Sequence, residues 1–508
     1  MIVHRAIVAG RRIAPRFIAF MSGESHSPDI PVSSNAIMRS MNCSLPTESL
    51  GNITQRLADA NARFHERYPG GSIERQPVHS VYGGAQLFKA GGHLRLGSLA
   101  LASLDEYAPN FAVFARALGL PGAESLPEQT ADAAAPAVQL TTQLAQIVYT
   151  RVREKLAREP VEDQRIDFED GYGYRADTEE DGHATLVGEQ LAEAMAAGAL
   201  PPFIGIRLKS FAPESLRRAV RTLDLVITTL AARTGGALPP HFVVTLPKVT
   251  IPEQVNALAE MLELLEARNG IAGAIAIDLM IETPQAIIGH QGQIAVPSLL
   301  QAGRGRVISV AFGTYDYTAS CDITAREQTH DHPAADFARH TLQASLAGTS
   351  IQISDGATTV LPIAPHRASG AHALTDRQQA ENRAAIHAAW RAHYDNVRRS
   401  MRHGFYQGWD LHPAQLPARY AAVYAFFLEQ LPDASKRLRA FVERAAQASL
   451  VGNSFDDAAT GQGLLNFFLR GIACGALAEE QAQAAGITIA ELHGRSFARI
   501  VANRAGRE

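Results

Sequence analysis

The feature that most constrains the fold of this chain is a series of short apolar segments, each followed by polar or glycine residues. The eight segments are residues 76–82, 166–168, 203–207, 241–246, 274–281, 306–312, 350–353 and 405–411. Amphipathic helical patterns separate them, as in residues 214–233, 252–268 and 376–401. Strands that alternate with helices form parallel sheets, and eight such strands close into a barrel. The pattern predicts an α/β fold, a (β/α)8 TIM barrel.

Further segments lie outside this barrel pattern. We expect an N-terminal helical extension over residues 45–75, with its helix at 45–68, followed by the barrel over 76–415. An Ala- and Leu-rich segment at about 99–162 separates the first two strands and predicts a helical insertion. Residues 416–508 predict a helical C-terminal region with helices at 416–431, 434–450, 458–477 and 479–500. We expect that region to form a cap or an oligomer contact.

The first 44 residues have a distinct composition. From Met1 to Gly23 there is no acidic residue, whereas four arginines are present. This resembles a weak transit peptide. We favour a disordered segment or an incorrectly assigned start, with Met38 or Met41 as the first residue.

Composition limits the functional classes. A formal net charge of -4 gives no overall attraction to nucleic acid or to an anionic membrane. No apolar run is long enough to span a membrane. Cys43, Cys321 and Cys474 are few and scattered, which argues against a disulfide framework or a Cys-based zinc site. These features favour a cytoplasmic protein.

Polar residues follow the predicted strands at the ends where a barrel enzyme builds its active site. Six of them each follow a different strand, namely Asp170, Arg207, Lys248, Glu282, Asp316 and His412. A barrel brings all of these ends to one mouth. We therefore expect these side chains to lie near one another.

Glu282 and Asp316 form the sharpest candidate pair, because they follow consecutive strands. Two carboxylates, completed by water and substrate oxygens, make a site suited to Mg²⁺ or Mn²⁺. The alternative is that Glu282 caps the short helix beginning at Thr283 and that Asp316 is a turn residue.

Arg207 ends an apolar strand, where a buried guanidinium requires a carboxylate or a substrate anion. Opposite a metal ion, it could hold an α-keto acid or a developing enolate. The alternative is a structural ion pair with Glu169 or Asp170. At least one of Asp167, Glu169 and Asp170 is expected to pair with Arg207 or to hold a metal-bound water.

The remaining candidates carry weaker signals. Lys248 could contact a substrate anion or a barrel carboxylate, and His412, beside a proline, could simply lock its loop. His330 and His332 alternate as metal ligands sometimes do, but two histidines on a loop are a weak signal.

Taken in order, several motifs resemble the citrate lyase β-subunit/HpcH–HpaI aldolase superfamily. They are Val81-Tyr-Gly-Gly84 with Lys89-Ala90, Asp167-Phe-Glu-Asp170, Ile206-Arg207-Leu208, Leu246-Pro-Lys-Val249, Met280-Ile-Glu-Thr-Pro284, Phe312-Gly-Thr-Tyr-Asp316 and Leu411-His-Pro-Ala-Gln415. The resemblance runs from about Gln76 to Gln415, interrupted by the insertion, which together with Asp-Phe-Glu-Asp-Gly-Tyr-Gly suggests an uncharacterised branch.

The resemblance implies a barrel in which Glu282 and Asp316 are the Mg²⁺ (or Mn²⁺) ligands. Arg207 corresponds to the arginine that stabilises an enolate or a substrate carboxylate, and Glu169 and Asp170 correspond to acidic residues of the same mouth, so all three are expected to be catalytic. We expect Lys248, Gly313 and Thr314 to bind substrate together with Arg207. The general base is not visible, although Asp456 or Asp457 are candidates.

The function that follows is a metal-dependent carbon–carbon lyase or aldolase. Its substrate would be a hydroxy or keto carboxylic acid, or the CoA thioester of one, and the reaction would pass through an enolate. The alternatives are a malate-synthase-like condensing enzyme and a catalytically silent barrel that serves as a binding or assembly subunit. Relatives commonly form trimers or hexamers, so a homo-oligomer is expected.

Overall fold

The computed structural model describes residues 47–71, 73–126, 136–368, 373–443, 449–451, 454–456 and 458–504. The predicted N-terminal segment, residues 1–44, lies outside the described residues. The chain divides into two units, Met1–Arg63 and Phe64–Glu508. Helix α1 (Thr47–Arg67) matches the helix predicted at 45–68 and supplies the described part of the first unit.

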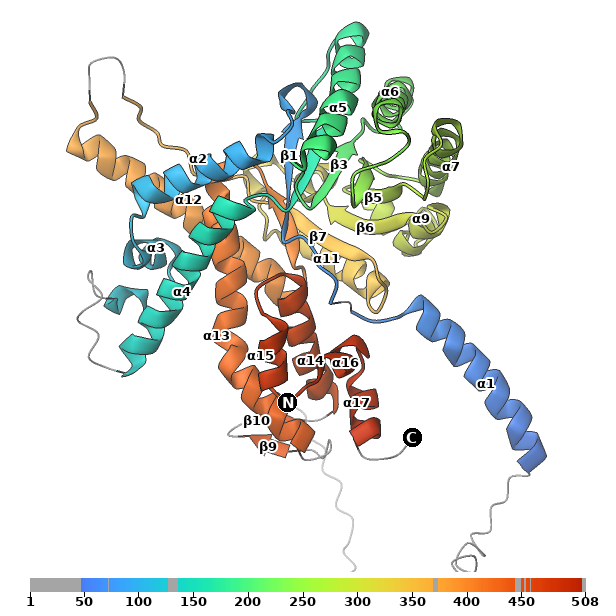
Figure 1. Cartoon of the computed structure of the whole chain (residues 1–508), viewed down its shortest axis with the longest axis vertical. Helices are drawn as coiled ribbons and strands as arrows, with labels where there is room; N and C mark the ends of the chain where they lie inside the picture. The colour runs from blue at the N-terminus through green and yellow to red at the C-terminus, as the bar shows by residue number, and fades with distance from the viewer. Residues whose placement is uncertain are drawn as a thin grey trace, which may run out of the picture. The chain divides into compact units, whose positions relative to one another are not determined.

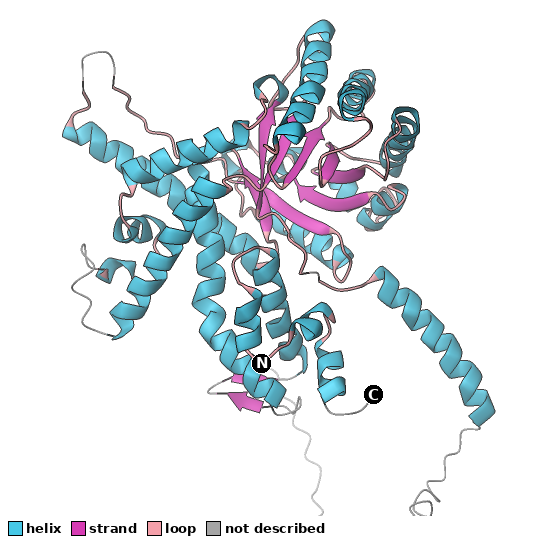
Figure 2. Ribbon diagram, in the orientation of Figure 1, coloured by secondary structure: helices cyan, strands magenta, loops and turns pink. Residues whose placement is uncertain are grey.

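The second unit is built on a closed barrel of eight strands, each parallel to its neighbours (Figures 1 and 2). The strands are β1 (His79–Gly84), β2 (Asp163–Asp167), β3 (Phe203–Arg207), β4 (Phe242–Leu246), β5 (Ala276–Ile281), β6 (Val307–Phe312), β7 (Gln352–Ala357) and β8 (Gln407–Asp410). The predicted (β/α)8 barrel is confirmed.

The interior of the barrel is polar, because side chains at alternate positions of a strand point inward. The Arg165 guanidinium donates to both oxygens of Asp163 at 2.9 Å and to the Thr245 hydroxyl at 3.1 Å. Asp278 accepts from Thr245 at 3.0 Å and from Ser309 at 2.5 Å. These mutual bonds satisfy polar groups that would otherwise be costly to bury.

Helices surround the barrel and bury the apolar outer faces of its strands. Ile204, Ile206 and Val244 are fully buried among the side chains of α5 and α6 in one continuous core. In Figure 1, α5, α6, α7 and α9 lie along the outside of the strands. The helices of this layer are α5 (Asp177–Ala197), α6 (Leu216–Thr234), α7 (Pro252–Asn269), α8 (Pro284–Ile287), α9 (Val296–Ala302), α10 (Thr314–Ser320) and α11 (Pro333–Leu346).

A second core joins the segment between β1 and β2 to the C-terminal helices. Phe114, Val148 and Trp390 are buried in it together with Phe427 and Phe468. Its helices are α2 (Gly92–Tyr107), α3 (Phe111–Leu118), α4 (Pro136–Arg158), α12 (Asp376–Arg402), α13 (Leu416–Glu443), α14 (Ala458–Ala473), α15 (Glu479–Ala484), α16 (Ile489–His493) and α17 (Phe497–Arg504). Strands β9 (Ser449–Val451) and β10 (Ser454–Asp456) form a separate antiparallel pair.

Two predicted helix boundaries in the C-terminal region are wrong. A single helix, α13, runs through Pro432, where the sequence predicted two helices that end and begin around that proline. Packing explains this continuity, since the helix is buried on both sides of Pro432, as Phe427 and Leu438 show. The single helix predicted at 479–500 is instead three short helices, α15, α16 and α17.

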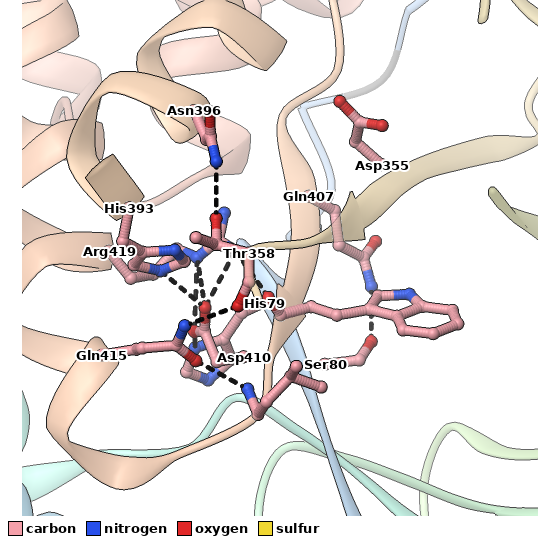
Figure 3. Close-up of polar contacts among 12 residues, drawn as sticks. His79, Ser80, Asp355, Thr358, His393, Asn396, Gln407, Asp410, Gln415 and Arg419 are labelled. Atoms are coloured by element: carbon pink, nitrogen blue, oxygen red, sulfur yellow. Dashed lines mark hydrogen bonds and ion pairs between the residues drawn. The ribbon is translucent and has the colours of Figure 1, made fainter. Parts of the chain in front are cut away.

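Asp410 at the end of β8 ties α12 and α13 to the barrel (Figure 3). Its carboxylate accepts from His79 Nδ1 at 2.7 Å and from Arg419 of α13 at 2.9 Å, and it lies 2.9 Å from His393 Nε2 of α12. All four side chains are at least 95% buried. Arg419 and two histidines outweigh the burial of Asp410 and hold its pKa well below the usual range.

Within the described part of the chain, no helix is both long enough and apolar enough to cross a membrane.

Candidate active site

Five of the six residues predicted to share the mouth of the barrel are brought together there with Glu169, namely Asp170, Arg207, Lys248, Glu282 and Asp316. Lys248, which follows β4, contacts Asp170 and Asp316 through its ammonium and Glu282 through its backbone N–H. It is connected to Arg207 through Glu169, which lies beside both cations. Its ammonium lies 2.6 Å from Glu169 Oε1, 3.3 Å from Asp170 Oδ2 and 3.7 Å from Asp316 Oδ1. The three groups that surround this ammonium are all carboxylates.

The backbone at Lys248 has a left-handed conformation, with φ of 50°. Such a conformation is uncommon for a residue with a side chain and costs about 1 kcal/mol. It persists here because the Lys248 backbone N–H donates to Glu282 Oε1 at 2.7 Å while the side chain points to the carboxylates of the loop after β2. Backbone strain of this kind is common at functional sites.

Burial disfavours the charged form of Lys248, but the carboxylates of Glu169 and Glu282 outweigh burial and raise the pKa of Lys248 well above its usual range. The ammonium is therefore positively charged throughout the physiological pH range. Its side chain keeps 32% exposure, so it is held by charge rather than by packing.

Glu282 lies deeper than the other carboxylates, with 1% exposure. Burial, together with the negative charges of Asp316 and Glu169, raises the pKa of Glu282 to about 8. Gly313, at the end of β6, leaves the room for this side chain, because a Cβ at position 313 would overlap the Glu282 carboxylate. Gly313 therefore shapes the site, and its predicted contact with substrate stays a prediction.

Thr314 is buried and its hydroxyl accepts from Arg339 at 3.3 Å. The hydroxyl is thus engaged with the outer layer of helices through α11. The predicted contact of Thr314 with substrate stays a prediction.

Arg207 is buried beside the same carboxylates. Its guanidinium donates to both oxygens of Asp167, at 2.7 Å and 2.5 Å, and lies 3.1 Å from Glu169 Oε2. It also lies over the Tyr82 ring, 4.8 Å from the centroid. Burial disfavours its charge, but Asp167 and Glu169 raise its pKa well above the usual range. The ion pair with Glu169 that we considered is present, whereas Asp170 pairs with Lys248 instead.

Glu169 lies between the two cations. Its Oε1 accepts from Lys248, and its Oε2 accepts no hydrogen bond from any described residue. Burial raises the pKa of Glu169, although Arg207 and Lys248 oppose that shift. A buried carboxyl with a raised pKa, one of whose oxygens accepts no hydrogen bond from a described residue, is suited to accepting and returning a proton.

The histidine candidates have structural roles. His412 Nδ1 accepts from the Ala414 N–H at 3.2 Å, which is the loop lock that we considered for it. His332 Nδ1 accepts from the Ala334 N–H at 3.1 Å and caps α11. His330 is buried 3.4 Å from Asp355, in the layer outside the barrel. Asp457 lies outside the described residues, so the general base predicted from the tail stays a prediction.

Among the residues that the structure describes, no group of three or more His, Cys, Asp or Glu side chains has the spacing of a metal site. A Mg²⁺ site requires fewer protein ligands than three, because the ion keeps several waters and binds through one or two carboxylates. Glu282 and Asp316 supply two, and the Lys248 ammonium lies 3.7 Å from Asp316 Oδ1. The residues therefore fit a hard divalent cation.

The sequence did not single out Tyr82, although it could have done so. Alternation along β1 places Ser80 and Tyr82 on the same inner face of the barrel, which is where the Tyr82 ring meets Arg207. Gly171 was also missed: a Cβ there would overlap the Asp167 carboxylate, whose Oδ2 accepts from the Gly171 N–H at 2.8 Å. The Asp-Gly pair in the loop was the available signal.

Comparisons with known proteins add the following. Residues 57–500 match a family described as "Domain of unknown function (DUF6986)". No curated protein matches the sequence. The fold is similar to a citrate lyase of Burkholderia xenovorans LB400, with 19% identity and a TM-score of 0.48 over 67% of this chain and 93% of that one. Native Haloferax volcanii malate synthase at 3 mM glyoxylate has 12% identity and a TM-score of 0.39, over 84% and 99% of the two chains.

Proposed function

Since this chain belongs to the DUF6986 family, a domain of unknown function, we propose its activity from the chemistry of the barrel mouth. The proposal is a divalent-metal-dependent carbon–carbon lyase or aldolase that acts on a hydroxy or keto carboxylic acid, or on its CoA thioester, through an enolate. The observation that carries it is the gathering of Arg207, Lys248 and the carboxylates of Glu169, Glu282 and Asp316 at one mouth.

In the cleavage direction, the substrate hydroxyl loses its proton and the carbon–carbon bond beside it breaks. The bonding electron pair moves to the neighbouring carbon, which becomes the carbon of an enolate. Negative charge then develops on the enolate oxygen, and fixed cations lower the barrier by meeting that charge. Arg207 and Lys248 supply positive charge at the mouth.

Glu169 is the proton carrier in this proposal. It lies between Arg207 and Lys248, and its Oε2 is free of hydrogen bonds from described residues. It accepts the hydroxyl proton of the substrate and returns a proton to the enolate carbon, so the protein ends the cycle in the state in which it began. Asp170, at the rim, accepts a hydrogen bond from the Lys248 ammonium at 3.3 Å.

Glu282 and Asp316 would hold the cation, which supplies Lewis-acid polarisation of the substrate carbonyl or carboxylate. Everything else in the mechanism is done by side chains of this chain. A condensing enzyme of the malate-synthase type would use the same residues, since it too forms an enolate next to a thioester carbonyl.

A deuterium-exchange experiment tests the enolate without knowledge of the full substrate. The protein is incubated in D₂O with Mn²⁺ or Mg²⁺ and either pyruvate or acetyl-CoA, and loss of the methyl proton signal is followed by NMR. We expect exchange with at least one compound, and no exchange in Glu282→Gln or after chelation. Exchange of acetyl-CoA alone would favour the condensing enzyme.

A substrate screen completes the test. Hydroxy acids and their CoA thioesters are supplied with Mg²⁺, and release of pyruvate, oxaloacetate or glyoxylate is measured. Absence of both exchange and cleavage, in a folded protein that binds the metal, would leave the silent-barrel alternative as the better description.

A further inference from the structure

The Lys248 ammonium lies among the carboxylates of the mouth, 3.7 Å from Asp316 Oδ1, and the Lys248 backbone N–H donates to Glu282 Oε1. We propose that Lys248 is a built-in substitute for the divalent cation, neutralising the carboxylate cluster in the metal-free protein and leaving it when the metal binds. This inference rests on the proposed function, because it assumes that Glu282 and Asp316 receive the metal.

The contacts of Lys248 resemble those of a counter-ion. Its ammonium lies 2.6 Å from Glu169 and 3.3 Å from Asp170, both in the loop after β2, and 3.7 Å from Asp316 in the first turn of α10. Lys209 offers a contrast, since its ammonium donates to the Phe168 carbonyl oxygen at 2.7 Å and to Glu180 at 2.8 Å, with 8% exposure. Both ammonium groups donate hydrogen bonds, but the Lys209 side chain is buried, whereas the Lys248 side chain is 32% exposed and faces three carboxylates.

The side chain of Lys248 has room to leave while its backbone stays. Its N–H remains bound to Glu282 Oε1 at 2.7 Å, which fixes the main chain at the metal site. Beyond this anchor, a flexible four-carbon stem carries the ammonium, and the side chain as a whole is 32% exposed. Asp316, with 44% exposure, and Asp170, with 60%, border the same open side.

Displacement has a consequence for substrate binding. Once a divalent cation neutralises Glu282 and Asp316, the ammonium is attracted less strongly to the cluster and becomes available to a substrate carboxylate or thioester oxygen. Lys248 would then serve the metal-free site and the substrate complex in turn, and the metal would bind before the substrate.

Calorimetric titration with Mn²⁺ alone tests the proposal. We compare the wild type with Lys248→Met, Glu282→Gln and the control Lys436→Met, an exposed lysine of α13. Removal of a competing charge about 4 Å from a ligand should tighten Mn²⁺ binding by about tenfold or more in Lys248→Met. Lys436→Met should bind as the wild type does, and Glu282→Gln should lose most affinity.

A second measurement distinguishes displacement of the Lys248 ammonium by Mn²⁺ from simple charge repulsion between the two cations. The wild type is treated with a limiting amount of an amine-reactive acetylating reagent. The rate of acetylation at Lys248 is measured by mass spectrometry with and without Mn²⁺. We expect a faster rate with Mn²⁺ in the wild type and no change in Glu282→Gln. Lys248→Gln replaces the methionine variant if the latter does not fold.

The outcomes distinguish the two hypotheses. Unchanged or weaker Mn²⁺ binding in Lys248→Met, with binding that still depends on Glu282, would overturn the role of Lys248 and leave the metal site intact. An acetylation rate that does not respond to Mn²⁺ would also overturn displacement. If neither the wild type nor Lys248→Met binds Mn²⁺, the metal site itself is rejected. Binding only in Lys248→Met would support the inference strongly.

Discussion

At the scale of single residues, Arg207 connects stability to the proposed chemistry. Its guanidinium holds both oxygens of Asp167 and also faces Glu169. In Arg207→Lys, an ammonium keeps the charge but cannot meet two carboxylates in one plane. We expect turnover to fall by roughly 10²–10³ and the free energy of unfolding to fall by about 1–2 kcal/mol, for one lost hydrogen bond.

Melting temperature and turnover measured on the same sample check this prediction. The matched control is Arg233→Lys on α6, because Arg233 forms an exposed ion pair with Glu189 of α5, and it should change neither quantity. Full turnover in a folded Arg207→Lys protein would make the arginine a structural residue only.

Gly313 gives a second prediction at this scale. A Cβ at position 313 would overlap the Glu282 carboxylate, so Gly313→Ala must displace the deepest carboxylate of the site. We expect about 1–3 kcal/mol of destabilisation from overpacking and a loss of Mn²⁺ affinity measured by calorimetry. Gly182→Ala in α5 is the control, because no heavy atom lies within 4 Å of its added Cβ. Unchanged Mn²⁺ affinity in Gly313→Ala would separate Glu282 from the metal.

At the scale of elements, the strands with apolar sequences were predictable and those with polar faces were less so. β3 begins and ends where the sequence predicted, because its residues are apolar on both faces except for Arg207. β2 begins at Asp163, three residues before the predicted start, because Asp163 and Arg165 point into the polar barrel interior. β7 extends to Ala357, where Asp355 and Gly356 suggested a turn.

The sequence predicted which residues lie at the strand ends of the candidate site, but not which of these residues pair with one another. Each charged residue follows a strand, so the sequence indicated that they share a mouth. The choice of Asp167 as the main partner of Arg207 depends on side-chain direction, which alternation alone leaves open. The left-handed backbone of Lys248 has no sequence signal either, since glycine is the usual residue there.

The attachment of α12 and α13 to β8 gives the next prediction. Asp410→Asn keeps the shape of the side chain but leaves the Arg419 guanidinium buried without its counter-charge. Breaking one partner of a buried ion pair costs about 3–5 kcal/mol. Denaturant unfolding should show a loss of that size, compared with a negligible loss for Asp395→Asn, whose ion pair with Arg391 is half exposed. A loss below 1 kcal/mol would show that Asp410 does not hold these helices.

The same cluster predicts how stability depends on pH. Burial lowers the pKa of His393 below 6.5, although Asp410 opposes that shift. The unfolded state therefore binds a proton before the folded state does, and stability falls as the pH drops below about 6.5. His393→Gln should reduce the slope of unfolding free energy between pH 6.5 and 5. His290→Gln, at an exposed position, should leave the slope unchanged; an equal slope in both variants would contradict the assignment.

At the scale of the whole molecule, the hydrophobic core continues outside the barrel. Residues of the insertion, such as Phe114 and Val148, share one core with Phe427 of α13 and Phe468 of α14. The insertion therefore depends on helices, α13 and α14, that follow the insertion itself by more than 250 positions in the sequence. Neither segment buries its apolar face alone, so the barrel and both additions should unfold together.

Two truncations test this dependence. A chain that ends at Gln415 loses α13 and exposes the apolar residues of α3 and α4, so we expect aggregation or loss of the cooperative thermal transition. A chain that begins at Phe64 removes only the first unit and should keep the melting temperature and the Mn²⁺ affinity of the full protein. Calorimetry and size-exclusion chromatography on both proteins give the comparison. A soluble chain ending at Gln415 with a normal melting transition would show that the barrel folds without its C-terminal helices, and the shared core would then stabilise the additions alone.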